Sequence, residues 1–125
     1  DYRPGETADH KIKKAEGQGM ALTLERTQDI LLWLGEHKKP GQFLCGFSME
    51  TENLIENSRK KLQKKNLDLV AANSLRQEGA GFGGSTNVLT LVSPEGEEPL
   101  PLMSKEEAAH RLLDRIGELR GGRHA

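Results

Sequence analysis

The sequence predicts an α/β fold with a Rossmann-like, doubly wound sheet, and three adjoining segments carry that prediction. Residues 42–47 form a short apolar run after Pro40-Gly41, as expected for a central strand covered on both faces. Residues 51–66 then show helical periodicity, and residues 67–72 form a second apolar run. A strand, a helix and a strand in this order predict a parallel crossover unit, the building block of doubly wound sheets.

The helix of this unit is expected to begin at Thr51 and to end near Asn66. The Thr51 hydroxyl can cap a helix, and asparagine tolerates the left-handed conformation that often follows a helix end. Between these two residues, apolar or small side chains recur at the spacing of one helical face: Leu54, Ile55, Ser58 and Leu62.

The N-terminal segment is predicted to change character at residue 20. Residues 1–19 are polar and contain Lys11 and Lys13, so we expect a mobile basic loop. Residues 20–25 alternate between apolar and other side chains, which predicts a strand with one buried face. Thr27 is expected to cap a helix that ends before Pro40-Gly41 and that buries Ile30, Leu31 and Leu34.

The C-terminal segment predicts a hairpin followed by a helix. Residues 79–85 form a glycine-rich loop, and strands are expected at 88–92 and 100–103 around a turn at 94–97. Ser104 and Glu107 form a capping box at the start of the last helix, and Gly121-Gly122 is expected to end it. The expected organisation is therefore one α/β body over residues 20–119 with a frayed tail at 120–125.

The composition limits the class of protein. The chain has 125 residues and a net charge of −1, which argues against a surface wholly devoted to nucleic acid or membrane. A single cysteine, Cys45, lies in an apolar run, so we expect a buried small side chain and a cytoplasmic protein. No apolar run approaches the roughly 20 residues of a membrane span.

One local feature points to anion binding: a cationic patch near the end of the 51–66 helix. Like charges four residues apart on a helix repel by about 0.2–0.5 kcal/mol per pair, and a bound anion would remove that repulsion. A solvated helix face explains the same pattern equally well, because cations are favoured near a helix C-terminus. The patch consists of Arg59, Lys60, Lys61, Lys64 and Lys65.

Three other sequence patterns that could indicate a binding or catalytic site give weaker evidence for one. Residues 79–84 match G-x-G-x-x-G, but no strand directly precedes them and no helix pattern follows, so we expect a connector. Histidine, cysteine and carboxylate spacings do not match a zinc site, and no metal-ligating residue is assigned. Glu50 and Glu52 follow the first strand, where carboxylates can bind a metal or act as a general base, and favourable charge in the first turn of a helix accounts for them equally well.

Six short motifs, in order along the chain, resemble those of phosphopantothenate–cysteine ligase. The resemblance covers the chain from Asp1 to about Ile116 and implies the C-terminal portion of the ligase domain. In bacteria that ligase is usually the second half of a bifunctional protein whose first half is an FMN-dependent decarboxylase, so FMN is expected only there. The motifs are Asp1-Tyr2-Arg3-Pro4, His10-Lys11-Ile12-Lys13-Lys14, Gly46-Phe47 with Glu50-Thr51, Asn66-Leu67-Asp68-Leu69-Val70, Gly81-Phe82 with Asn87, and Pro99-Leu100-Pro101-Leu102.

The resemblance implies a reaction and a set of site residues. In the family, CTP activates 4′-phosphopantothenate to an acyl-cytidylate, and the amine of L-cysteine then displaces CMP to form the amide. Mg²⁺ is the expected ion, and Lys11 the residue expected to stabilise transition-state charge. The residues that match nucleotide-contacting positions of the family are Asp1, Lys11, Gln28, Asp29, Ile30, Leu31, Phe47, Lys61 and Lys65.

The sequence also departs from the family pattern. Asn73-Ser74 stands where Asn-Asp is usual, Ser48-Met49 where two alanines are common, and Gln28 where proline is common. The family's first Rossmann strands precede Asp1, so this chain is expected to be incomplete for catalysis alone. The resemblance further implies a homodimer, with pairing across a two-fold axis by strands near residues 11–24 and 88–103.

A different class of function remains open at this point. The patch at Arg59–Lys65 is also compatible with a non-catalytic module that binds nucleic acid or another polyanion, with an affinity that falls steeply with salt. Aromatic residues make up only 4% of the chain and none lies within the patch, which argues against base stacking. The ligase is therefore the expected function, and no nucleic-acid partner is expected.

Overall fold

The structure is a computed structural model that describes residues 1–13, 16–17, 19–74 and 86–123. The predicted glycine-rich loop at 79–85 lies outside these residues. The chain divides into two compact units, Asp1–Ile30 and Leu31–Ala125. The two units are described separately, and the second contains the main sheet.

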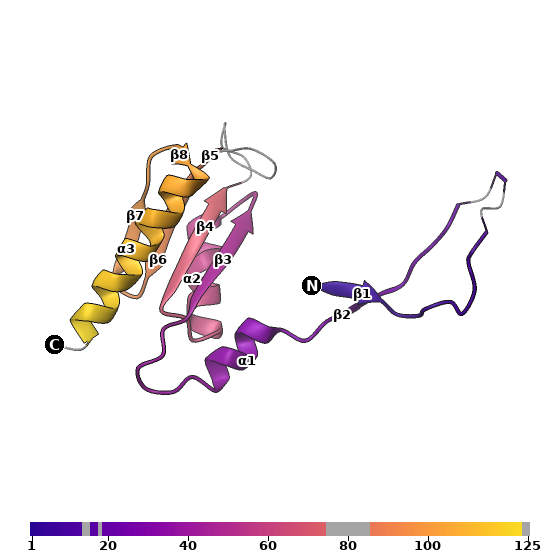
Figure 1. Ribbon diagram of the computed structural model, residues 1–125, viewed down its shortest axis with the longest axis horizontal. Helices are drawn as coiled ribbons and strands as arrows, with labels where there is room; N and C mark the ends of the chain where they lie inside the picture. The colour runs from indigo at the N-terminus through magenta and orange to yellow at the C-terminus, as the bar shows by residue number, and fades with distance from the viewer. Residues whose placement is uncertain (14–15, 18, 75–85, 124–125) are drawn as a thin grey trace. The chain divides into compact units, whose positions relative to one another are not determined.

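The second unit is built on a four-stranded mixed sheet with the order β3-β4-β6-β7 (Figure 1). Its strands are β3 (Cys45–Glu50), β4 (Leu69–Ser74), β6 (Leu89–Ser93) and β7 (Gly96–Pro99). β3 and β4 are parallel and are joined by α2 (Leu54–Lys64), which confirms the predicted order of strand, helix and strand. The first strand was predicted at 42–47 as a central strand, but it spans 45–50 and lies at one end of the described sheet. β6 and β7 continue the sheet in antiparallel pairing.

Helices cover both faces of this sheet, and the apolar side chains on the two sides of β4 pack against them. Val70 and Ala72 pack with α2 on one face. Leu69 and Ala71 pack on the other face with residues of α3 (Lys105–Arg123). Figure 1 shows α2 and α3 on opposite sides of the sheet. This arrangement confirms the predicted α/β fold and accounts for the unbroken apolar run that predicted a fully buried strand.

A buried carboxylate holds the start of β3 against β4. Asp68 Oδ2 accepts a hydrogen bond of 2.8 Å from the backbone N–H of Leu44. Lys38 Nζ lies 3.3 Å from the same oxygen and also donates to the backbone oxygen of Asn66 at 2.7 Å. Because hydrogen bonds to charged groups are among the stronger ones, this junction fixes where β3 begins.

Helix α1 (Ile30–Glu36) packs closely on the end of α2. Gly35 is buried, and a Cβ atom at that position would overlap the backbone oxygen of Lys65. Leu31 packs in the same cluster as α2. Ile30 and Leu34, which were predicted to be buried, are exposed, because glycine rather than leucine lies at the close approach.

The predicted start of α2 was wrong and its predicted end was confirmed. The N-cap is Asn53, whose φ is 50° and whose side chain makes no capping hydrogen bond, because β3 runs on to Glu50 and Thr51 lies in the bend that follows. At the other end Asn66 has a φ of 54°, the left-handed conformation predicted for a helix stop.

The C-terminal strands differ from the predicted hairpin. β6 pairs with β7 at residues 96–99, because the turn after Ser93 is tight, and the Leu100 N–H adds one bond of 2.8 Å to Leu89 O, so the predicted partner strand at 100–103 was wrong. β8 (Met103–Ser104) instead pairs with β5 (Thr86–Asn87). Ser104 Oγ accepts a 3.1 Å hydrogen bond from the Glu107 N–H, which confirms the start of the last helix. That helix continues through Gly121 to Arg123, so its predicted end was wrong.

The first unit contains a small antiparallel pair, β1 (Tyr2–Pro4) and β2 (Leu24–Arg26). The backbone N–H of Gly5 donates to Thr23 O at 2.9 Å, which extends the pairing by one bond. The strand predicted at 20–25 is therefore shorter and begins later, and the face predicted to be buried is exposed at Met20, Leu22 and Leu24. Tyr2–Pro4 is a strand within the segment predicted to be a loop. In the described part of the chain no helix has the length and apolar character needed to cross a membrane.

Candidate functional site

The strongest polar constellation lies at the carboxyl end of β3, on the face that α2 covers. Lys61 Nζ lies 3.2 Å from Glu50 Oε1 and donates to Ser48 Oγ at 3.4 Å. Ser48 Oγ in turn donates to Glu50 Oε1 at 3.5 Å. Ser48 and Glu50 are two residues apart on a strand, so both side chains point to the same face. We call these three residues the Lys61 cluster.

The Lys61 cluster is only partly open to solvent. The side chain of Lys61 is 38% exposed and that of Glu50 is 22% exposed, while Ser48 is fully buried. An ammonium group has three N–H donors, so the contacts with Glu50 and Ser48 leave one for a further acceptor. The cluster therefore presents a positioned cation at the end of a parallel strand, where α/β sheets usually bind ligands.

The other cations of the patch point elsewhere. Arg59 Nη2 lies 2.7 Å from Glu97 Oε1, and Arg59 Nη1 donates to Ser93 O at 3.3 Å. Lys60 Nζ lies 3.3 Å from Glu56 Oε1 on its own helix. These contacts tie Arg59 to the β6–β7 hairpin and Lys60 to the exposed side of α2, so the patch does not form one continuous anion-binding surface.

Lys65 follows Lys61 by four residues and caps α2. Its backbone N–H donates to Lys61 O at 3.0 Å, and residues four apart lie on the same face of a helix. Lys65 is half-buried, and its backbone oxygen lies against Gly35. The packing of α1 thus fixes the helix end that presents both lysines.

Phe47 lies on the opposite face of β3 from the Lys61 cluster. Alternation along the strand places its side chain on the same face as Cys45, which packs in the cluster with α3. Phe47 is 67% exposed, an unusual degree for phenylalanine in a strand. The structure therefore brings Phe47 and Lys61 to the same strand but not to the same face.

The remaining predicted site residues are described in the first unit or at its boundary. Asp1 O accepts a 2.9 Å hydrogen bond from the Thr27 N–H, and Lys11 is exposed outside the strands. Gln28 and Asp29 precede α1, in which Ile30 and Leu31 are the first residues. Asp1, Lys11, Gln28, Asp29 and Ile30 belong to the first unit, whereas Leu31, Phe47, Lys61 and Lys65 belong to the second.

Sequence reasoning missed two residues beside the strand ends. Glu50 was attributed to helix-start charge, yet it lies in β3 and contacts Lys61; its spacing of two from Ser48 was the available signal. Asn73 is buried at the end of β4, opposite Met49, and its Oδ1 has no hydrogen-bond partner in the described structure. A lone asparagine after an apolar run gave no indication of this.

Cys45 does not have the properties of a nucleophile. It is half-buried in β3, and burial raises the pKa of its thiol to about 11. The thiol therefore stays protonated at neutral pH, as expected for a cysteine that packs as a small apolar side chain. Within the described residues, no three histidine, cysteine or carboxylate side chains gather as a metal site.

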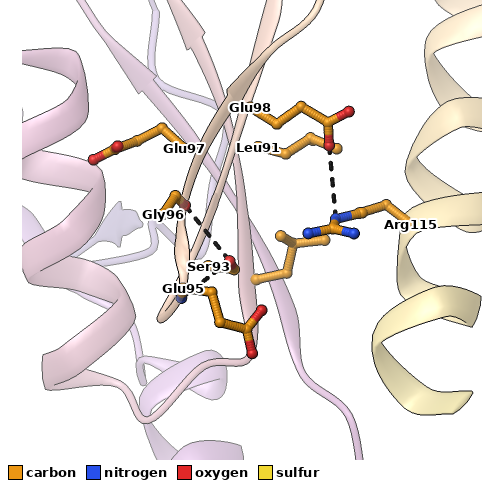
Figure 2. Close-up of a pocket in the computed structure, with 8 residues that line it drawn as sticks. Leu91, Ser93, Glu95, Gly96, Glu97, Glu98 and Arg115 are labelled. Carbon is orange, nitrogen blue, oxygen red and sulfur yellow. Dashed lines mark hydrogen bonds and ion pairs between the residues drawn. The ribbon is translucent and has the colours of Figure 1, made fainter. Parts of the chain in front are cut away.

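Two cavities in the second unit lie away from the Lys61 cluster. One cavity, of about 130 Å³, lies between the β6–β7 hairpin and α3 (Figure 2). Arg115 Nε lies 3.6 Å from Glu98 Oε2 at this cavity. Arg115 also pairs with Glu118 at 3.0 Å, and Ser93 Oγ accepts from the Glu95 N–H at 3.3 Å. A larger cavity of about 710 Å³ lies before the amino end of β3 and is lined by Trp33, Leu34, His37, Lys39, Gly41, Gln42, Phe43, Leu44 and Arg120.

Comparison with known proteins gives consistent matches across the chain. Residues 1–119 match the family model described as DNA/pantothenate metabolism flavoprotein C-terminal domain. The chain is 47% identical over 120 residues to the Coenzyme A biosynthesis bifunctional protein CoaBC of Bacillus subtilis, covering 95% of this chain and 29% of that protein. It is 40% identical over 117 residues to a Cysteine/Cysteine sulfinic acid decarboxylase of an unknown prokaryotic organism, covering 93% and 32%.

A solved structure shows the same fold. The C-terminal domain of a Coenzyme A biosynthesis bifunctional protein CoaBC superposes with a TM-score of 0.71 at 34% identity, covering 95% of this chain and 49% of that one. The chain thus spans about three tenths of the length of the two curated relatives and about half of the solved domain.

Proposed function

Since the chain belongs to the DNA/pantothenate metabolism flavoprotein C-terminal domain family, we propose that it forms the nucleotide-binding part of a phosphopantothenate–cysteine ligase. The proposed reaction activates the carboxylate of 4′-phosphopantothenate with CTP and then joins it to the amine of L-cysteine, a step of coenzyme A synthesis. The observation that carries the proposal is the 47% identity to a bifunctional coenzyme A protein over nearly the whole chain.

The Lys61 cluster supports this proposal chemically. Open α/β sheets usually bind ligands at the carboxyl ends of their strands, and Lys61 is held there with a donor still available for a phosphate oxygen. Lys65 lies one turn further along α2, and together the two lysines would neutralise phosphate charge. Phe47 would pack on the base or sugar from the other face of β3.

The first unit supplies the residues proposed for the chemical step. Lys11 would stabilise the negative charge that develops on the α-phosphate as the carboxylate attacks and pyrophosphate departs. Asp1 and the segment Gln28–Leu31 would contact the nucleotide, the latter through backbone N–H groups. When bound, Mg²⁺ would offset phosphate charge, and it is usually held by one or two carboxylates together with substrate phosphates.

The second step needs no covalent group from this chain. The amine of L-cysteine would attack the acyl carbonyl, the carbon–oxygen bond to CMP would break, and the amine would lose a proton. Residues that contact phosphopantothenate or cysteine are not assigned within this chain. The complete reaction is proposed for a full-length protein that contains this chain.

The proposal includes a homodimer in the cytoplasm. Large apolar side chains of the first unit are exposed, Met20 by 66% and Leu22 by 65%, and a second copy would cover them. Light scattering tests this directly, because a strictly monomeric protein at micromolar concentration would contradict it.

A second candidate is a contribution to decarboxylation, and the match to a relative named as a cysteine or cysteine sulfinic acid decarboxylase favours it. The proposed nucleic-acid or polyanion module is not favoured. Arg59, Lys60 and Lys61 each pair with a carboxylate, which lowers the net charge that the patch presents.

The experiment uses the full-length protein with 4′-phosphopantothenate, CTP, Mg²⁺ and L-cysteine. Mass spectrometry should detect the cysteine amide together with CMP and pyrophosphate, and Lys11→Ala should abolish all three. Decarboxylation of the amide product is measured in parallel. Loss of decarboxylation with intact ligation in a Lys61→Ala variant would favour the second candidate instead.

A further inference from the structure

The carboxylate of Glu50 already contacts the Lys61 ammonium, the group that would bind a phosphate oxygen. It lies 3.2 Å from the Lys61 ammonium, and the buried Ser48 hydroxyl contacts both groups. The strand fixes Glu50, because its backbone pairs with Ser74 of β4. The carboxylate is therefore built into the cluster and cannot be moved away without breaking these contacts.

The negative charge of Glu50 therefore offsets part of the positive charge that Lys61 presents to an anion. Lys61 has one donor left after its contacts with Glu50 and Ser48, so an incoming phosphate would share the ammonium with the carboxylate. At a partly exposed site, two negative charges within a few ångströms of each other repel measurably. A ligand with fewer net negative charges experiences less of this repulsion.

We propose that Glu50 makes the site selective for the magnesium-complexed nucleotide over the metal-free nucleotide. This rests on the proposed function, in which Lys61 binds the triphosphate. Bound Mg²⁺ makes the triphosphate less negative. The Glu50 carboxylate therefore repels the magnesium complex less than it repels the metal-free nucleotide. Glu50 is thus a specificity-determining residue that acts through charge beside Lys61.

The substitution Glu50→Gln isolates this charge. Glutamine keeps an oxygen that can accept from Lys61 and Ser48, and it removes only the negative charge. Glu50→Asp keeps the charge on a shorter side chain. Glu56→Gln is the matched control, because Glu56 lies on α2 and pairs with Lys60 instead of Lys61. It corrects for the general change in net charge.

Calorimetry on the full-length protein measures the dissociation constant of CTP, once with Mg²⁺ and once with EDTA. Glu50→Gln should tighten metal-free CTP by about two- to fivefold, the range expected for a partly exposed charge pair, and should tighten the magnesium complex less. Glu50→Asp should keep the wild-type ratio of the two constants, and Glu56→Gln should change that ratio less than Glu50→Gln does.

The outcomes separate this inference from the function on which it rests. In one outcome, wild-type protein binds CTP, Lys61→Ala weakens that binding, and Glu50→Gln and Glu56→Gln give the same ratio of the metal-free to the magnesium-bound dissociation constant. The selectivity role of Glu50 is then wrong, and the nucleotide site at Lys61 stands. Weaker binding of both forms by Glu50→Gln would likewise overturn it, and would make Glu50 a residue that only positions Lys61. No binding of CTP by wild-type protein would overturn both proposals.

Discussion

Substitution of Gly35 by alanine should destabilise the second unit, because α1 meets the end of α2 at that residue. An alanine Cβ would overlap the backbone oxygen of Lys65 and lie 2.7 Å from its carbonyl carbon. Backbone atoms cannot turn aside as a flexible side chain can. Asn66 Nδ2 also donates to Gly35 O at 3.0 Å, so movement of α1 would weaken that bond as well.

Two opposing effects set the magnitude. Alanine is favoured over glycine inside a helix by about 1 kcal/mol. Overpacking against a fixed neighbour typically costs about 1–3 kcal/mol, and a clash with backbone lies at the upper end or beyond. The net expectation is a loss of about 2 kcal/mol in the free energy of unfolding. For a domain of this size that loss corresponds to a fall of roughly 6–12 °C in Tm.

The assay is thermal and urea unfolding followed by circular dichroism, with Gly117→Ala as the matched control. Gly117 also lies in a helix, but a Cβ there meets nothing within 4 Å, so that variant should be as stable as wild type or more stable by up to about 1 kcal/mol. A Gly35→Ala protein that unfolds at or above the wild-type temperature would refute the packing described for α1 on α2.

Two further predictions concern the second unit. Asp68→Ala should cost about 3–5 kcal/mol, because it removes the carboxylate that pairs with the half-buried Lys38 ammonium and accepts from the Leu44 N–H. Asp68→Asn should cost less, and equal urea midpoints for both variants would contradict this. Because the pKa of Cys45 is raised to about 11 in the folded chain, the unfolded chain loses its thiol proton first as pH rises. Stability should therefore fall between about pH 9 and pH 11, and a Cys45→Ala variant should lack that part of the pH dependence, which unfolding at several pH values would measure.

The strand, helix and strand unit could be predicted because its signals are local. Apolar runs identified β3 and β4, and the left-handed Asn66 marked the helix end. The start of α2 was less predictable than the Ser104 start of α3, because the cap at Asn53 depends on how far β3 extends. The partner of β6 depended on turn geometry, which the sequence of Pro94 to Glu97 leaves open.

The candidate site could be predicted only in part, for a similar reason. Lysine spacing predicted a cationic helix end, but not that Lys61 contacts the strand while Lys60 points away. The role of Glu50 depends on a contact across 11 residues, and Asn73 on burial by neighbouring strands. Tertiary contacts of this kind leave no periodic signal in the sequence.

The most direct test of nucleotide binding at the end of β3 compares two adjacent lysines. CTP affinity is measured by calorimetry on full-length protein with Mg²⁺, for Lys61→Ala and for Lys60→Ala, which removes the same charge from the exposed side of α2. Loss of a charged hydrogen bond to phosphate costs about 1.5–3 kcal/mol, so Lys61→Ala should weaken binding by about 10- to 100-fold and Lys60→Ala by less than about threefold. Equal effects of the two substitutions, or no effect of Lys61→Ala, would contradict the placement of the nucleotide at the Lys61 cluster.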